Sequence, residues 1–175
     1  MEQTIYYKER QKGYKEALKE TKKSQRSSFE NQIKLKLYKW WAEWKPDYEG
    51  WLKVADTLYA DSCKIDAIGP ETQIFKDYKA AMKHQRDAFS MDMGPIEQCV
   101  VENDTVCIFY KMYMTFKGDM FGRKKGDEIV LKVTEFNTFD YVDGYDEPMV
   151  VHLNLITTGF NLGELAPLYL QQLFT

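Results

Sequence analysis

The chain has 175 residues, of which 44% are hydrophobic, and its formal net charge is −3. This composition suits one compact domain with a sizeable core, and it argues against a disordered chain or a partner with a phosphate backbone. Three cysteines without a CxxC spacing, together with only two histidines, argue against a zinc site and against a disulfide framework.

The first third of the chain predicts helices. Residues 1–27 mix basic and acidic side chains, which is typical of a solvated helical extension and not of a nucleic-acid or membrane patch. Apolar residues recur at three- and four-residue steps from Phe29 to Trp44, which indicates a helix that ends before Pro46. Asp47 is a suitable N-cap for a second, shorter helix.

A short strand and a third helix are predicted next. The strand covers CKIDAIG, residues 63–69. Pro70 then takes the first position of the helix, where its missing N–H costs nothing. The apolar face continues to Phe89, so this helix is expected to reach that residue.

After residue 90 the hydrophobic period changes to two, which predicts strands. Residues 96–102 and 105–117 flank Asn103-Asp104, a pair suited to a tight hairpin turn, and further strands are predicted at 128–141 and 149–157. Two of these strands are about 13 residues long against a usual five or six, and long strands twist and curl. The predicted fold is therefore α+β: a cone-shaped, curved antiparallel β-sheet wrapped on three N-terminal helices (a cystatin-like α+β barrel), with the extension at 1–27 preceding a domain at 28–175.

Two polar side chains stand on the apolar face of the strand at 128–141. Period two places Glu135 and Asn137 in line with Ile129, Val133 and Phe139. A buried carboxylate is costly unless it is paired, and it tends to keep its proton. The face therefore predicts a polar site inside the cone, unless a bulge or a one-residue slip turns it outward.

The neighbouring strand supplies the rest of the predicted interior. Lys111 and Lys117 fall on one face and mark it as the outer one. The opposite face, which is then the inner one, carries Ile108, Tyr110, Met112, Met114 and Phe116.

The order of elements resembles the nuclear transport factor 2-like superfamily, with LYAD (residues 58–61) at the end of the second helix. ENDTVCIFYKMYMTFKGDMFG (102–122), FNTFDYVDG (136–144) and the tail LYLQQLFT (168–175) resemble the SnoaL-like polyketide cyclases within it. The resemblance implies a conical cavity and proton shuttling next to a carbonyl, without a metal or a cofactor. Departures bear on activity, since Asn137 stands where that group often has Asp and Val151 where it often has Glu.

The sharpest hypothesis is a cofactor-independent cyclase, isomerase or dehydratase acting on a hydrophobic carbonyl compound. Glu135 is the candidate base and Tyr110 the candidate oxyanion donor. His152, grouped by alternation with Val150 and Asn154, competes for the acid–base role. The candidate ligand contacts are Trp41, Tyr59, Asp66, Met112, Met114, Asn137 and Phe139.

Two non-catalytic alternatives stay open. One is a ligand-binding module of the same fold, and the other is a dimerisation or interaction module. The outer face, with Lys111, Tyr113, Lys132 and Phe136, mixes polar and apolar residues as interfaces do, so a homodimer is expected. No apolar segment is long enough to cross a bilayer and no secretory core is present, so a soluble cytoplasmic protein without a nucleic-acid or membrane partner is expected.

Overall fold

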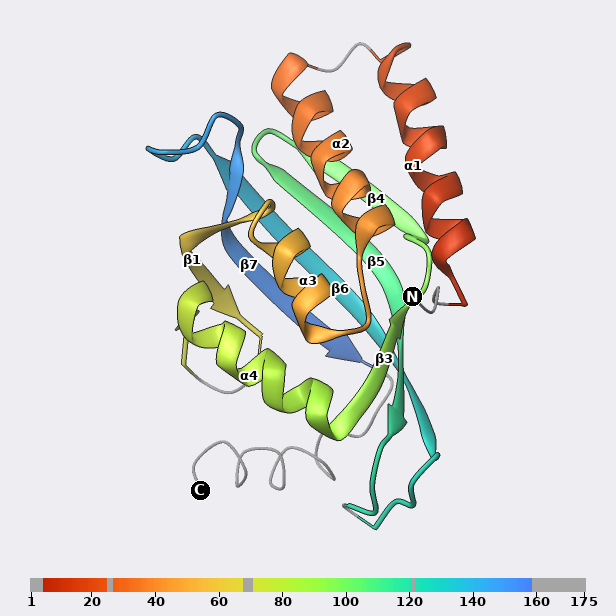
Figure 1. Ribbon diagram of the computed structural model, residues 1–175. Helices are drawn as coiled ribbons and strands as arrows, with labels where there is room; N and C mark the ends of the chain where they lie inside the picture. The colour runs from red at the N-terminus through yellow and green to blue at the C-terminus, as the bar shows by residue number, and fades with distance from the viewer. Residues whose placement is uncertain (1–4, 25–26, 68–70, 121, 159–175) are drawn as a thin grey trace.

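The computed structural model describes residues 5–24, 27–67, 71–120 and 122–158, which form helices that cover one side of a curled sheet (Figure 1). The helices are α1 (Tyr7–Thr21), α2 (Ser28–Glu43), α3 (Tyr48–Ala55) and α4 (Phe75–Ala88). The strands are β1 (Tyr59–Asp66), β2 (Gln73–Ile74), β3 (Phe89–Met93), β4 (Gln98–Glu102), β5 (Thr105–Phe116), β6 (Glu128–Asp140) and β7 (Met149–Thr158). This is the predicted α+β architecture, a bent sheet wrapped on helices.

Local capping fixes where the covering helices begin. Ser27 and Glu30 form a capping box at the start of α2, in which each side chain bonds the backbone N–H of the other residue. The Asp47 carboxylate accepts from Gly50 N at 2.7 Å and begins α3, as the sequence predicted. The α2 helix ends before Pro46, so the chain turns sharply between two helices that pack on the same side of the sheet.

The sheet has the order β2-β1-β7-β6-β5-β3, and β4 pairs with the same edge of β5 as β3 does. β3 pairs with the second half of β5 and β4 with its first half. The hairpin between β4 and β5 turns at Asn103, whose φ of 55° is the left-handed conformation that asparagine tolerates. The two long strands, of 12 and 13 residues, pair over 11 positions and form the spine of the sheet.

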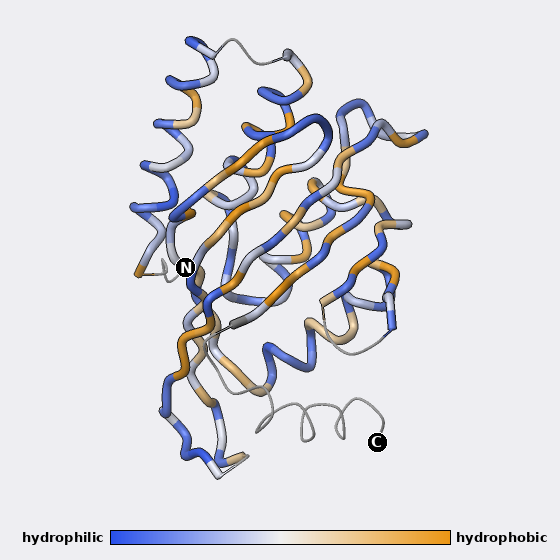
Figure 2. The backbone as a smooth tube through the Cα atoms, turned by 180° about the vertical axis from the view of Figure 1, so that it is seen from behind, coloured by the Kyte–Doolittle hydropathy of each residue, from blue (hydrophilic) through white to orange (hydrophobic). Residues whose placement is uncertain are grey.

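The interior lies between this spine and the helices. Along β5 every second residue is buried, from Val106 through Tyr110 to Phe116, as the alternation predicted. The sheet seen from the side away from the helices shows the same alternation of hydrophilic and hydrophobic residues along its strands (Figure 2). α2 contributes Ile33, Leu37, Trp40 and Trp41 to the core, so the helical stripe and the inner face of the sheet bury each other.

Several predicted boundaries were wrong. α4 ends at Ala88 and Phe89 begins β3, a strand that the sequence reading assigned to the helix and its following loop. β1 begins at Tyr59, ahead of the predicted start at Cys63. It pairs with β7 in parallel, so the sheet is mixed and not wholly antiparallel. The predicted helix start at Pro70 lies outside the described residues.

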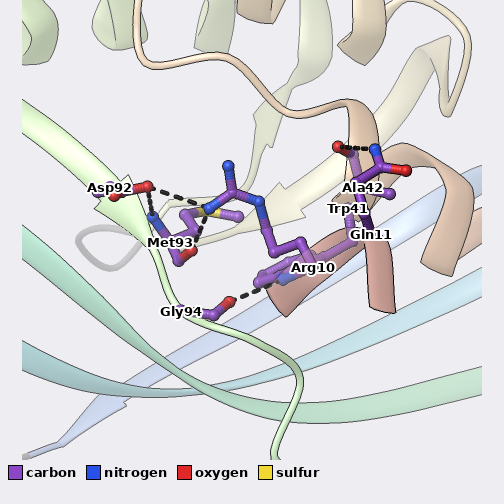
Figure 3. A network of polar contacts seen from close by, with 7 residues as sticks. All are labelled: Arg10, Gln11, Trp41, Ala42, Asp92, Met93 and Gly94. Carbon is purple, nitrogen blue, oxygen red and sulfur yellow. Dashed lines mark hydrogen bonds and ion pairs between the residues drawn. The ribbon is translucent and has the colours of Figure 1, made fainter. Parts of the chain in front are cut away.

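The extension contains a helix, α1, that lies against α2 and is fastened to β3 (Figure 3). Arg10 is buried, its guanidinium pairs with Asp92 at 3.0 Å, and it also donates to the Met93 carbonyl. Gln11 donates to the carbonyl of Ala42 at 2.8 Å. α1 is therefore held by a buried charge pair and not only by its weakly apolar face.

Substituting Arg10 with methionine is expected to destabilise the protein by about 2–3 kcal/mol, because Asp92 and the Met93 carbonyl lose a charged donor. Chemical denaturation measures the change. Lys12→Met on the same helix removes an exposed i,i+4 pair with Glu16 and should cost less than about 0.5 kcal/mol. Equal effects of the two substitutions would contradict the anchoring role of Arg10.

Candidate functional site

A carboxyl group and a phenol meet at the centre of the interior. Glu135 on β6 and Tyr110 on β5 are 3% and 1% exposed. Ile108 is registered opposite Glu135, so Tyr110 is the next residue along the same inner face of β5. The Tyr110 hydroxyl donates to Glu135 Oε2 at 3.0 Å. The strand register thus places the carboxyl and its donor side by side.

Burial decides the protonation of this carboxyl. Desolvation raises the pKa of Glu135, and hydrogen bonding from Tyr110, Asn137 and Tyr59 opposes the rise without cancelling it. Burial is also the first cause that raises the pKa values of Tyr110 and Tyr59 well above their usual range, and the nearby carboxyl adds to it. Both phenols therefore stay protonated donors, and burial favours the protonated form of Glu135.

The interior contains buried polar atoms whose hydrogen bonding is incomplete. Within the described part of the chain, Glu135 Oε1, both amide atoms of Asn137 and Trp40 Nε1 are sealed from solvent and make no well-aligned hydrogen bond, although Asn137 and Tyr59 lie close enough to Glu135 to lower the pKa of its carboxyl. Buried polar atoms are nearly always bonded, and those without a protein partner commonly bond water or a ligand. Two acceptor oxygens and two N–H donors are thus available to a small polar group.

Aromatic rings surround this polar centre. Trp41 meets Tyr110 edge-on with ring centroids 4.4 Å apart, and its Nε1 donates to the Gly94 carbonyl at 2.9 Å (Figure 3). Trp40 meets Tyr59 edge-on at 5.9 Å. The other predicted contacts Met112, Met114 and Phe139 are also buried in the core. The structure thus gathers Trp41, Tyr59, Met112, Met114, Asn137 and Phe139 in the core that contains Glu135 and Tyr110.

Sequence reasoning missed Trp40 as a polar contributor. Its helical spacing marked it correctly as a core residue, and nothing in that pattern says where an indole N–H points. The available signal in the sequence is that Trp40 and Trp41 are adjacent, which brings two indole N–H donors to one end of the helix. In the structure the Trp41 N–H is bonded to a backbone carbonyl and the Trp40 N–H is not.

His152 and Asp66 lie apart from this centre, on the outer face of the sheet. The His152 Nε2 and Asp66 Oδ2 atoms are 2.6 Å apart, and the Thr72 hydroxyl donates to the other Asp66 oxygen at 2.6 Å. These bonds, first that from Thr72 and then that from His152, lower the pKa of Asp66. The pair joins β1 to β7 and does not approach Glu135.

A bulge explains why the predicted grouping of His152 with Val150 was wrong. Val150 pairs with Phe139, yet His152 pairs with Thr138, so Val151 is an extra residue in β7. Val150 is fully buried while the His152 side chain is 43% exposed. Because of this extra residue, residues of β7 that simple alternation would place on one face lie on opposite faces before and after Val151.

The described residues give no sign of a metal centre or a membrane span. They contain no cluster of three His, Cys, Asp or Glu side chains that could hold an ion. No helix among them is long and apolar enough to cross a bilayer.

Solved structures identify the architecture. A candidate SnoaL-like polyketide cyclase from Jannaschia sp. CCS1 superimposes with a TM-score of 0.61 at 17% identity, covering 77% of this chain and 90% of that one. A nuclear transport factor 2-like protein from Anabaena variabilis gives 0.58 at 10% identity, covering 77% and 95%. This chain has the nuclear transport factor 2-like fold.

A third neighbour of this fold is a candidate polyketide cyclase from Xanthomonas campestris pv. campestris, with a TM-score of 0.55 at 15% identity, covering 81% of this chain and 99% of that one. No family model and no curated protein matches the sequence. Identities this low carry the nuclear transport factor 2-like fold and not an activity, because one fold hosts many functions. Any chemistry of this chain therefore depends on the residues of the Glu135 centre.

The buried carboxyl predicts a pH-dependent effect of Glu135→Gln on stability. An acid whose pKa is raised on folding favours the folded state when it is protonated. This contribution to stability is fully present below the glutamate pKa of the unfolded chain, about 4.3, and it is lost as the pH rises through the pKa of the folded protein. The always neutral glutamine should therefore raise Tm by a few degrees at pH 8, with a difference that narrows toward pH 4.

Thermal unfolding across this pH range measures the effect. Glu128→Gln, at the exposed start of the same strand, is the control and should show no comparable trend. A Tm difference between Glu135→Gln and the unmodified protein that does not grow with pH would show that Glu135 titrates normally.

Proposed function

We propose that the interior of this fold binds a small, mostly apolar carbonyl compound and that Glu135 transfers protons on it. The observation that carries the proposal is a buried carboxyl, with a raised pKa, that has one oxygen fixed by Tyr110 and the other in no well-aligned hydrogen bond. A general acid–base group needs a pKa near the working pH and an atom free to reach the proton. The reaction class is isomerisation, cyclisation or dehydration by proton shuttling.

The hydrogen bonds assign the roles differently from the sequence-based hypothesis. The Tyr110 proton is already donated to Glu135 Oε2, so Tyr110 orients the carboxyl, and Oε1 is the atom that takes and returns a substrate proton. Trp40 Nε1 has no hydrogen-bond partner, and Asn137 Nδ2 makes no well-aligned bond, although Asn137 lies close enough to Glu135 to lower the pKa of its carboxyl. These two groups would stabilise the oxygen on which negative charge develops when a proton leaves the adjacent carbon.

A ligand screen followed by an exchange experiment tests this function. Aromatic polyketides, sterols and small ketones are screened for thermal stabilisation, and a ketone that binds is incubated in D2O while NMR follows deuterium uptake next to its carbonyl. Glu135→Gln should slow the uptake at least about 100-fold, the usual contribution of a general base. Binding should change only a few-fold, because the neutral amide keeps the shape of the side chain.

The Tyr110→Phe variant is the matched probe of orientation. It leaves the carboxyl in place but removes the hydroxyl, so exchange should fall while the ring contact with Trp41 is kept. If Glu135→Gln exchanges as fast as the unmodified protein, the catalytic role is excluded.

The alternative is a binding module without catalysis. Asn137 cannot accept and return a proton as an aspartate would, and Trp41, Tyr110 and Phe139 fill much of the interior, each at 1% exposure. Under this alternative the same polar atoms bond a ligand in its ground state. A ketone that stabilises the protein but shows no exchange would favour it.

A homodimer through the outer face of the sheet is proposed as the assembly. Val100, Phe136 and Ile156 are between 38% and 61% exposed there, on three strands, and Val100 and Phe136 are both registered against Cys107. Phe136→Lys should shift the protein toward monomer in sedimentation velocity. Ile74→Lys, at an exposed position on the edge strand β2, should leave the assembly unchanged.

A further inference from the structure

Two buried arginines contact the same tryptophan at the end of α2. The guanidinium carbon of Arg10 lies 5.4 Å from the Trp44 ring centroid, and that of Arg86 lies 5.8 Å from it. Both residues are almost completely buried, at 1% and 5% exposure. Buried guanidinium groups are costly unless charge and hydrogen bonds compensate them.

The two arginines differ in how their charge is compensated. Arg10 has the Asp92 carboxylate at 3.0 Å. Arg86, in the last turn of α4, donates Nε to the Pro46 carbonyl at 3.2 Å and places Nη1 3.8 Å from the Met82 sulfur. Among the described residues no carboxylate lies within ion-pair distance of Arg86, and its Nη2 has no hydrogen-bond partner.

The surroundings of the Arg86 side chain are mostly aromatic. Its guanidinium carbon lies 4.7 Å from the Trp51 ring centroid, and Lys117 donates to its backbone carbonyl. The acid that acts on it electrostatically is Asp47, whose Oδ1 already accepts from Gly50 N at 2.7 Å as the cap of α3. Burial lowers the pKa of Arg86 to about 10, so the group is still a cation at neutral pH.

We propose that Arg86 binds the oxyanion group of an acidic ligand, a carboxylate or a phosphate. A guanidinium offers parallel N–H donors that match two oxygens of such a group, and Arg86 retains an unpaired Nη2 for this purpose. The aromatic and carbonyl contacts fix the plane of the guanidinium, which leaves the anion as the missing partner of its charge. This site does not depend on the proton-transfer role of Glu135.

Thermal unfolding at constant ionic strength tests the proposal, with chloride replaced stepwise by acetate, benzoate or inorganic phosphate. Ligands that bind only the folded state raise Tm in a saturable way. At least one oxyanion should do so for the unmodified protein, and comparison of the carboxylates with phosphate identifies the preferred group. Arg86→Met should raise the half-saturating concentration at least tenfold or abolish the response.

Arg10→Met is the matched control, since it removes a buried arginine from the same indole but one that already has a carboxylate. It should lower Tm and keep the anion response, and Glu135→Gln should keep it as well. Should Arg86→Met fail to fold, Arg86→Lys replaces it and is expected to weaken binding at least three-fold, because the ammonium cannot bind two oxygens in parallel. No saturable response in the unmodified protein, or an unchanged one in the Arg86 variant, would overturn the site.

Discussion

The central constraint on this structure is a single carboxyl group, that of Glu135, buried in an apolar interior. Glu135 cannot reach water, so its charge state is set by burial and by the Tyr110 hydroxyl at 3.0 Å. A buried glutamate with one oxygen in no well-aligned hydrogen bond makes no evident contribution to packing. The proposed proton transfer would account for its presence among valine, isoleucine and phenylalanine neighbours.

The fold supplies what this group needs. Two strands of 12 and 13 residues keep their register over 11 pairs, so Glu135 and Tyr110 are placed by backbone hydrogen bonds and not by a loop. The α2 helix then covers them with two adjacent tryptophans. Trp41 is bonded to Gly94 and packs on Tyr110, whereas the Trp40 N–H is left without a protein partner. Rigid strands and a fixed helix together give a polar centre in a hydrophobic shell.

The sequence predicted this centre better than it predicted the edges of the sheet. Period two alone placed Glu135, Asn137 and Tyr110 inside, because β5 and β6 alternate without interruption. The same alternation gave the wrong face for His152 relative to Val150, because Val151 is an extra residue in β7 and the side chains change faces there. A bulge of this kind leaves no signal in the composition. The strand β3 was missed because Phe89, its first residue, also extends the helical stripe of α4. The parallel pairing of β1 with β7 depends on contacts far apart in the chain, which local patterns do not carry.

Direct observation of the Glu135 proton tests the account most directly. NMR of protein with 13C-labelled glutamate side chains would follow each carboxyl carbon with pH, and the signal absent from Glu135→Gln identifies the buried group. Glu135 is expected to titrate at a higher pH than a glutamate in water, because burial raises its pKa. A Glu135 signal that titrates together with the exposed glutamates would contradict a protonated carboxyl at the centre of the fold.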